Sequence, residues 1–226
     1  MVLALGIIWG GVAFFIELAD DMTEAEGQAF DQRVLAFVRP GADPADAIGP
    51  DWLHTAMLDF TSLGGLSVLL LFALVAIGFL LIQRKPWSAL MLAIALSGGL
   101  LLSEVMKGVF QRDRPPLLFQ SVETINASFP SGHALLSTVF YLTLGVMLER
   151  AFARRRLKIY VLSVAVVIAG LVGISRVYLA AHWASDVMAG WALGAAWAMV
   201  CWLAAYAVQR QAVKRGVPEA TALEGG

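Results

Sequence analysis

Three short segments of this chain carry residue types suited to gripping a phosphate group and attacking it. They are Lys107 with Arg114-Pro115 after six residues, then Pro130-Ser131-Gly132-His133, then Ser175-Arg176 with His182 after five residues and Asp186 after three more. Together they contain three cations, two imidazoles and one carboxylate. Cations and backbone N–H groups stabilise charge on phosphate oxygens, and an imidazole can act as nucleophile or proton carrier. The pattern predicts phosphoryl-transfer chemistry.

His182 and Asp186 are the most informative pair. A spacing of four residues at the start of an apolar run predicts that both lie on one helix face and hydrogen-bond. An ionisable residue inside a membrane helix is costly and is by default a functional candidate. A carboxylate that holds one ring nitrogen fixes the tautomer and leaves the other nitrogen free as a nucleophile. Arg176, across the preceding turn, is permanently charged. A buried ion pair with only a structural role is the alternative.

Ser131, Gly132 and His133 stand just before another apolar run. Ser131 is a natural N-cap, and a helix N-terminus offers free N–H groups to an anion. Gly132 lets the backbone approach a phosphate closely. The alternative is an ordinary capped helix that carries a surface histidine.

Lys107 and Arg114 are separated by almost two helical turns, so both can lie on one face if the helix continues that far. Pro115 then ends the helix, because proline disfavours α geometry in the residue before it. Two cations at the end of a membrane span can also be snorkelling anchors, which is the alternative here.

The composition indicates what must position these residues. The 226 residues are 59% hydrophobic and 15% charged, with a mean hydropathy of +0.76. An average soluble domain is about 45–50% apolar and about 25% charged. We expect an all-α bundle of six transmembrane helices that forms one membrane-embedded domain over residues 1–226. The six predicted spans cover residues 2–18, 62–82, 87–109, 133–152, 158–178 and 183–208.

The first predicted span begins at Met1 without a basic region and ends at Glu17-Leu18-Ala19-Asp20. Since this end lacks a small-x-small cleavage site, we expect a retained helix and not a removed signal peptide. The absence of residues before the span suggests that the start of the chain is either trimmed or misassigned. Cys201 is the single cysteine, which excludes an internal disulfide, and its apolar surroundings favour inert packing.

Basic residues in the connections predict the orientation. They are Arg84 and Lys85 after the second span, Arg150, Arg154, Arg155, Arg156 and Lys158 after the fourth, and Arg210, Lys214 and Arg215 after the sixth. The positive-inside rule places these connections and both termini in the cytoplasm. The three motifs then meet on the extracytoplasmic face, which indicates an integral protein of a bacterial plasma (inner) membrane.

Segment 19–61 is predicted to lie outside as a short interfacial segment. It contains nine acidic residues and two arginines: Asp20, Asp21, Glu24, Glu26, Asp31, Asp43, Asp46, Asp51 and Asp59 against Arg33 and Arg39. Apolar residues at 34–38 predict a short amphipathic helix, followed by an irregular stretch with three prolines. A solvated loop is an equally open interpretation. The tail 217–226 is predicted to be disordered.

The three motifs match, position by position, the signature of the type-2 phosphatidic acid phosphatase superfamily: Lys-x6-Arg-Pro, Pro-Ser-Gly-His and Ser-Arg-x5-His-x3-Asp. The match runs from Lys107 to Asp186, and the six-span layout extends it over most of the chain. The chain thus resembles integral-membrane lipid phosphate phosphatases.

The resemblance implies metal-independent hydrolysis of lipid phosphate mono- or diesters at the outer face of the membrane. By analogy, His182 attacks phosphorus and forms a phosphohistidine, Asp186 orients His182, and His133 protonates the leaving group and then activates water. Lys107, Arg114, Ser131, Gly132 and Arg176 bind the phosphate. No cofactor and no metal are expected, and no Asp/Glu/His cluster in the sequence offers a metal site.

The expected partners are a membrane lipid phosphate and the bilayer. A net charge of −1 gives no reason to expect a nucleic acid, and no required protein partner is evident. Candidate substrates are undecaprenyl diphosphate, phosphatidylglycerophosphate and phosphatidic acid. Two alternatives stay open, a lipid phosphoryltransferase of the same fold and a transporter that binds lipid headgroups. The soluble haloperoxidases of the same superfamily are disfavoured by the six apolar spans.

Overall fold

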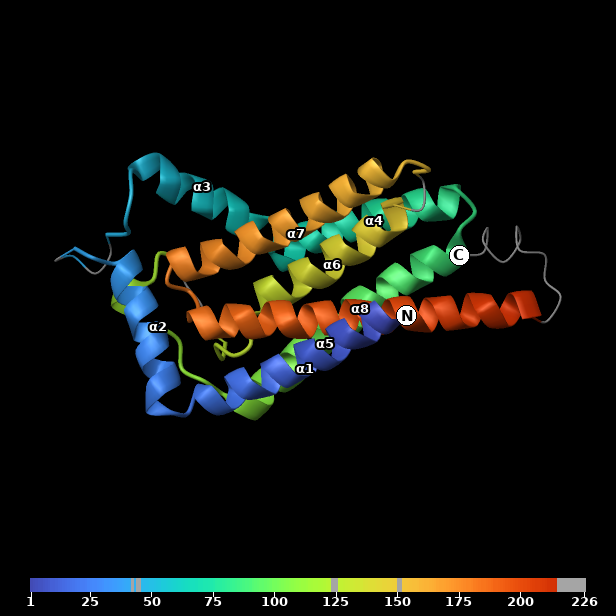
Figure 1. Cartoon of the computed structure of the whole chain (residues 1–226). Helices are drawn as coiled ribbons and strands as arrows, with labels where there is room; N and C mark the ends of the chain where they lie inside the picture. Colours follow the sequence, from blue (N-terminus) through green and yellow to red (C-terminus); the bar gives the residue numbers. More distant parts are fainter. Residues whose placement is uncertain (42, 44–45, 123–125, 150–151, 215–226) are drawn as a thin grey trace.

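The computed structural model describes residues 1–41, 43, 46–122, 126–149 and 152–214, and every regular element within them is helical. Eight α-helices and one 3₁₀ turn follow in order: α1 (Val2–Asp21), α2 (Ala25–Val38), α3 (Asp51–Ser62), α4 (Leu66–Ile82), α5 (Pro86–Phe110), η1 (Leu117–Phe119), α6 (Gly132–Glu149), α7 (Arg155–Tyr178) and α8 (Ala184–Lys214). Figure 1 shows the long helices side by side as one bundle, with α2 and α3 at one end.

The predicted all-α membrane bundle is confirmed. Five described helices, α1, α5, α6, α7 and α8, are long and apolar enough to cross a bilayer. The count reaches six when α3 and α4, which meet at a bend of 51°, are taken as one broken span. The predicted second span, 62–82, corresponds to the end of α3, the bend and the 17 residues of α4.

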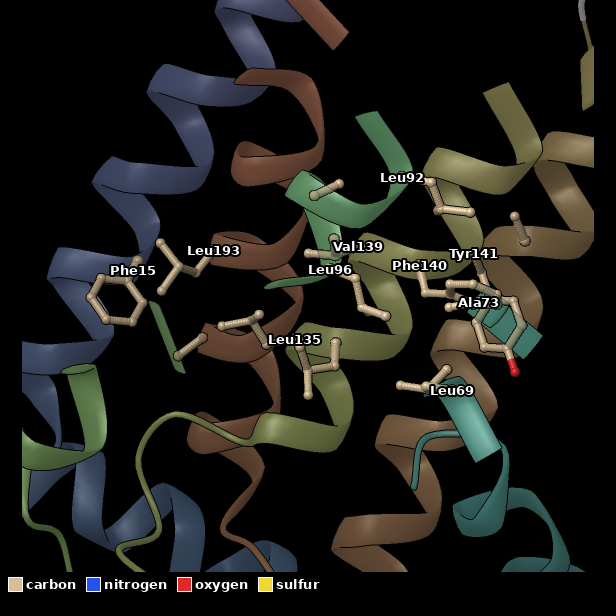
Figure 2. Packing of buried hydrophobic residues seen from close by; sticks show 14 of the residues in the cluster. Phe15, Leu69, Ala73, Leu92, Leu96, Leu135, Val139, Phe140, Tyr141 and Leu193 are labelled. Atoms are coloured by element: carbon tan, nitrogen blue, oxygen red, sulfur yellow. The ribbon is translucent and has the colours of Figure 1, made fainter. Parts of the chain in front are cut away.

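Helix α6 lies at the centre and packs against α4, α5, α7 and α8. Its residues from Ala134 to Tyr141 are all buried. Figure 2 shows Leu135, Val139 and Phe140 of α6 among side chains from the surrounding helices. Tyr141 also donates a hydrogen bond to the carbonyl of Leu63, 2.9 Å away, at the bend between α3 and α4. The element that carries the second motif is therefore the most enclosed helix of the bundle.

Two glycines of α8 bring α6 and α8 unusually close together. A Cβ at Gly190 would lie 2.7 Å from the carbonyl oxygen of Ser131, and one at Gly194 would lie 2.8 Å from that of Leu135. Any larger residue would force the helices apart, since these contacts are with backbone atoms. This spacing of four residues places the start of α6 directly against the first turns of α8, where the second and third motifs lie.

The outer surface of the bundle is apolar where lipid would contact it. On α4, Leu70, Leu71, Leu74 and Val75 are exposed, and α7 exposes Val166 and Val167. A soluble protein would bury such residues, whereas hydrocarbon chains solvate them as well as a protein core does.

Segment 19–61 is more ordered than the sequence predicted. The amphipathic helix expected around 34–38 is present and longer, as α2, so the solvated-loop alternative is wrong. The irregular stretch expected after it ends at Pro50, because α3 begins there: Pro50 is the N-cap, and Asp51 lies in the first turn, where a carboxylate favours the helix dipole. The predicted disordered tail, Arg150 and Arg215 lie outside the described residues.

Candidate active site

The three sequence motifs meet at one end of the bundle. Helices α5 and α7 end there, and α6 and α8 begin there; α2 and α3 lie at the same end, on the left of Figure 1. The backbone N–H of Ser131 donates to the carbonyl of Asp186 at 3.0 Å, which fixes the second motif to the third.

His182 and Asp186 are paired as predicted, although not on one helix. The distance from His182 Nδ1 to Asp186 Oδ2 is 3.5 Å, and both side chains are almost fully buried. Helix α8 begins only at Ala184, so His182 lies in the turn before it. The reason is the carboxylate itself: Asp186 Oδ2 accepts the backbone N–H of Trp183 at 2.9 Å, as the third residue of a helix does when it caps the first turn.

Asp186 has partners that the sequence did not reveal. Arg112 Nη1 donates to Asp186 Oδ1 at 2.6 Å, and the hydroxyl of Ser128 donates to Asp186 Oδ2. Both carboxylate oxygens are thus engaged, with Arg112 on one and Ser128, Trp183 and His182 on the other. A buried carboxylate with this many donors is held in its ionised form and in one orientation.

The second ring nitrogen of His182 faces a guanidinium. His182 Nε2 lies 3.1 Å from Arg114 Nη1. Because an arginine N–H can only donate, Nε2 carries a lone pair here, and Nδ1 carries the proton that points to Asp186. Burial lowers the pKa of His182 to about 4, against the opposing effect of Asp186, and nearby Arg114 and Arg176 lower it further. His182 is therefore neutral at pH 7, with its lone pair on Nε2.

Arg114 is clamped by the backbone. Its Nε, Nη1 and Nη2 donate to the carbonyls of Asn126, Ala181 and Ala127 at 2.6, 2.7 and 3.3 Å. Burial lowers the pKa of Arg114 from its ordinary value, and the charge of Asp186 partly restores it. Arginine keeps its proton under such shifts, so Arg114 is a fixed cation beside His182.

Lys107 and Arg114 do not share a helix face, and that prediction is wrong. Helix α5 ends at Phe110, four residues before Arg114, because Gln111 adopts a left-handed conformation with φ of 44°. Its backbone N–H and side chain bond back to the carbonyls of Lys107 and Gly108 and stabilise this end. The helix thus stops before proline can stop it, and Arg114 reaches the site from an extended loop.

Lys107 reaches the site from α5 and lies against the start of α6. A Cβ on Gly132 would lie 3.4 Å from Lys107 Nζ and 3.2 Å from Ser103 Oγ, so glycine leaves room between these groups and the α6 backbone. Ser131 precedes α6, and its Oγ accepts the N–H of Ala134 at 3.5 Å, in agreement with the predicted N-cap. Lys107 Nζ is also 3.2 Å from Glu104 Oε1, which is half exposed.

Arg176 lies at the end of α7 and is buried. Its Nη1 donates to Thr61 Oγ1 of α3 at 3.0 Å, while its Nε has no hydrogen-bond partner within the described part of the chain. The hydroxyl of Ser103 is likewise buried and unpaired among these residues. Leaving a buried polar group unpaired costs on the order of 1–3 kcal/mol, and more if it is charged.

His133 lies in the first turn of α6, largely shielded from solvent. It interacts electrostatically with Arg176, His182, Lys107 and Arg114. The structure thus brings all eight predicted site residues to one end of the bundle, although they come from α5, α6, α7, α8 and two loops. Membrane anchoring does not account for Arg114 and Arg176, because both point into the protein.

Sequence reasoning missed Arg112, Ser128 and Thr61. Arg112 lies two residues before Arg114. From the sequence alone, an isolated second arginine in a loop is interpreted as a charge on the protein surface. Ser128 and Thr61 carry no sequence pattern; they belong to the site only because the loop that contains Ser128 and the end of helix α3 that contains Thr61 pass next to it. The only sequence signal for these three residues was that Arg112 is a cation within the first motif.

The family follows from the comparison with known proteins. The model of the PAP2 superfamily matches residues 86–210, more than half of the chain. The chain belongs to the PAP2 superfamily. Phosphatidylglycerophosphatase B from Bacillus subtilis is 32% identical over 187 residues, which cover 80% of this chain and 86% of the relative. An undecaprenyl-diphosphatase from Sulfolobus acidocaldarius is 31% identical over 120 residues, or 51% of this chain and 54% of that protein.

Solved structures agree with this assignment. The crystal structure of the transmembrane PAP2-type phosphatidylglycerolphosphate phosphatase from Bacillus subtilis superimposes with a TM-score of 0.79 at 29% identity, covering 86% of this chain and 93% of that one. The crystal structure of Aquifex aeolicus LpxE gives a TM-score of 0.58 at 20% identity, with coverages of 76% and 94%, and supports the fold alone. This PAP2 member is an integral membrane protein and a lipid phosphatase, as predicted.

Proposed function

We propose that this PAP2 enzyme hydrolyses lipid phosphates or diphosphates at the outer face of the membrane, through a phosphohistidine on His182 and without a metal ion. The observation that carries the proposal is the state of His182. Asp186 holds its Nδ1–H, which leaves the Nε2 lone pair directed at Arg114, where a phosphate would bind.

In the first step, His182 Nε2 attacks phosphorus in line with the scissile P–O bond. A P–N bond forms as the P–O bond breaks, and the oxygen of the departing alcohol or phosphate takes a proton from His133. The attacking imidazole becomes positively charged, and ionised Asp186 stabilises that charge through Nδ1–H.

In the second step, water attacks the phosphohistidine. His133, now neutral, accepts a proton from the water, the P–N bond breaks, and inorganic phosphate leaves with His182 neutral again. Using one residue first as acid and then as base follows from microscopic reversibility. His133 interacts electrostatically with His182, and either role requires the two rings to be near each other.

The phosphate oxygens need fixed donors, and several are available. Arg176 Nε and Ser103 Oγ are buried and unpaired within the described residues, and Lys107 Nζ and Ser103 Oγ both lie close to Gly132 at the α6 N-terminus. Arg114 adds a second guanidinium beside His182. A phosphate would satisfy these groups at once, and donors preorganised in this way stabilise the transition state without reorganisation.

We propose phosphatidylglycerophosphate, undecaprenyl diphosphate and phosphatidic acid as candidate substrates. The two named relatives act, by their names, on the first two of these classes. The test is phosphate release by the purified enzyme from each lipid in detergent micelles, with EDTA present. Release that persists in EDTA and vanishes in His182→Ala supports the proposal, whereas release that requires an added metal, or survives the substitution, contradicts it.

The same assay separates a hydrolase from a phosphoryltransferase. An acceptor lipid alcohol is added to the micelles, and both free phosphate and phosphorylated acceptor are measured. A hydrolase transfers phosphate to water at a rate that the acceptor leaves unchanged. Transfer to the acceptor at the expense of free phosphate would replace the proposal by the transferase alternative.

The outer location of the site is a second part of the proposal. It rests on the basic residues between α4 and α5 and at the start of α7, at the end of the bundle away from the site. In a Cys201→Ser background, a cysteine at Gln28 of α2, which is exposed, should react with an impermeant thiol reagent in intact cells. A cysteine at the exposed Gln83 should react only after lysis. The reverse pattern would overturn the orientation.

A further inference from the structure

Arg112 connects two carboxylates from distant parts of the chain. Its Nη1 donates to Asp186 Oδ1 at 2.6 Å and to Ser185 Oγ at 2.8 Å, and its Nη2 donates to Asp31 Oδ2 at 2.7 Å. The guanidinium also lies over the ring of Trp183, with 5.7 Å between its central carbon and the ring centroid. None of these contacts is with a group assigned to phosphate binding above.

Asp31 is a charged residue of α2 that is only 2% exposed. Its Oδ1 accepts the backbone N–H of Ser185 at 2.9 Å, and its Oδ2 accepts the Ser185 hydroxyl at 2.5 Å in addition to Arg112. It therefore acts as a cap for the first turn of α8, supplied by a helix 154 residues away in the sequence. A solvated acidic segment, as the charges of region 19–61 suggest, would not bury a carboxylate here.

The electrostatic balance of this cluster depends on Arg112. Two buried carboxylates, Asp31 and Asp186, share one guanidinium, and each makes a close ion pair with it. Burying a charge is unfavourable unless a partner compensates it. The burial of each of these three charged groups therefore depends on the other two. Removing Arg112 leaves two anions near each other, whereas removing Asp31 leaves Arg112 without the contact that fixes its second nitrogen.

The cluster affects His182 by fixing the orientation of the Asp186 carboxylate. Asp186 Oδ2 faces His182 Nδ1, and Arg112 is the side chain that holds the other oxygen, Oδ1. Without that hold only the donors on Oδ2 restrain rotation of the carboxylate about its Cβ–Cγ bond. A less restrained carboxylate is a weaker partner for the imidazole, whose proton it fixes on Nδ1 and whose lone pair it thereby leaves on Nε2.

We infer that Asp31 and Arg112 are positioning residues, and that α2 orients the nucleophile through the chain Asp31–Arg112–Asp186–His182. This inference rests on the proposed role of His182 and extends it to a helix outside the sequence motifs. The segment before the signature motifs thus contributes to the chemistry.

The test uses the full-length enzyme in detergent micelles with phosphatidylglycerophosphate or phosphatidic acid, whichever it hydrolyses faster. Asp31→Asn and Arg112→Gln should lower kcat about 10-fold and about 100-fold or more, while KM changes less than about 3-fold, since neither residue grips phosphate. Arg112→Lys, which keeps the charge but cannot bridge both carboxylates with one planar fork, should recover only part of the loss. Glu26→Gln, an exposed carboxylate on the same helix, is the control and should behave as wild type.

Two further readouts separate positioning from simple loss of structure. The double variant Asp31→Asn/Arg112→Gln should lose no more kcat than Arg112→Gln alone, because both act through one bridge. The acidic limb of the kcat/KM profile should move to higher pH in Arg112→Gln, because removing a cation near the Asp186–His182 pair favours protonated His182. The other groups that face His182, namely Asp186 of α8, Arg114, Arg176 of α7 and His133 of α6, remain unchanged in that variant.

The outcomes also distinguish this inference from the proposed mechanism. Activity that survives in His182→Ala contradicts the mechanism itself. If His182→Ala is inactive but Asp31→Asn and Arg112→Gln match Glu26→Gln in kcat, the bridge has no positioning role and only this inference is overturned. Should Arg112→Gln fail to elute as a folded species, Ser185→Ala, which removes one hydroxyl from the bridge and keeps every charge, decides in its place. A several-fold fall in kcat at constant KM supports the bridge, and an unchanged kcat overturns it.

Discussion

The two sides of the His182 ring are built differently. On the Nδ1 side, Asp186 is engaged by Arg112, Ser128 and the Trp183 backbone, and Arg112 is itself held by Asp31. On the Nε2 side lies Arg114, and among the groups proposed to bind phosphate the described residues leave the buried Arg176 Nε and Ser103 Oγ without a partner. One half is complete before any substrate binds, and the other half offers donors that a phosphate can use.

This difference indicates how the enzyme divides its tasks. Orientation of the nucleophile must survive each catalytic cycle, so the polar groups that provide it are satisfied by protein. Groups that bind the phosphate must release their partner every cycle. Arg176 Nε and Ser103 Oγ make no internal hydrogen bond among the described residues that would compete with substrate, whereas backbone carbonyls fix the position of Arg114. Substitutions on the two sides should therefore differ in kind: loss of kcat on the Nδ1 side, and loss of both kcat and affinity on the Nε2 side.

The largest effect on activity is expected from removing the imidazole ring of His182. His182→Ala should lower kcat by about 10⁵-fold or more, since the nucleophile of a covalent mechanism has no substitute. Phosphate release from the best lipid substrate measures it. His54→Ala, on α3, is the control and should stay within about 2-fold of wild type. A loss in His182→Ala of less than 100-fold would remove the covalent mechanism.

On the Nδ1 side, Asp186→Asn should lower kcat by about 10³–10⁴-fold with little change in KM, since an amide stabilises neither the correct tautomer nor the imidazolium of His182. Steady-state kinetics measure both constants. Asp113→Asn, an exposed residue of the same loop region as Arg112, is the control. If Asp186→Asn raised KM and left kcat unchanged, the proposed difference between the Nδ1 side and the Nε2 side of His182 would be contradicted.

On the side that binds phosphate, Arg176→Gln should lower kcat/KM by about 10²–10³-fold, with an increase in KM as well as a fall in kcat. Inhibition by inorganic phosphate or vanadate should weaken in parallel, which reports affinity without turnover. Arg33→Gln, an exposed arginine of α2, serves as control. Unchanged phosphate inhibition together with a lowered kcat would assign Arg176 to the positioning side.

Ser103→Ala should have a smaller effect of the same kind, raising KM about 3- to 10-fold through one lost hydrogen bond. Thermal stability should stay the same or rise, because the substitution removes a buried hydroxyl that is unpaired among the described residues. Ser97→Ala on the same helix, whose hydroxyl bonds to the carbonyl of Ala93, is the matched control. A KM identical in both variants would exclude Ser103 from the phosphate site.

The last prediction concerns the position of the acidic limb of the pH profile. Only neutral His182 can attack, and burial lowers the pKa of His182 to about 4. For a group that must be unprotonated, kcat/KM is constant above this pKa and falls tenfold per pH unit below it. The acidic limb should therefore lie near pH 4, measured with a substrate whose phosphate ionisation is corrected for. A limb near pH 6.5 would show that the ring is not buried as described.

The sequence by itself determined the membrane bundle and most of the proposed phosphate site. Long apolar stretches with few charges allow little except membrane helices, because unpaired backbone groups are too costly in hydrocarbon. The serine–glycine pair before α6 is a local pattern whose geometry follows from helix capping. The spacing of four between His182 and Asp186 predicted their pairing, although His182 lies in the turn before α8 and the Asp186 carboxylate caps that helix. Positions such as Lys107 and Arg176 were readable because charges are rare in apolar runs.

Only the tertiary structure decided which other groups complete the site. The left-handed turn at Gln111 ends α5 early and directs Arg112 towards Asp186. No periodic pattern in the sequence predicts such a turn. Asp31 looks like one acidic residue among nine in a polar segment, yet it is buried because α2 packs its carboxylate onto the first turn of α8. The contribution of these residues depends on contacts between segments 74 to 154 residues apart, and a linear sequence does not encode such contacts in any local spacing.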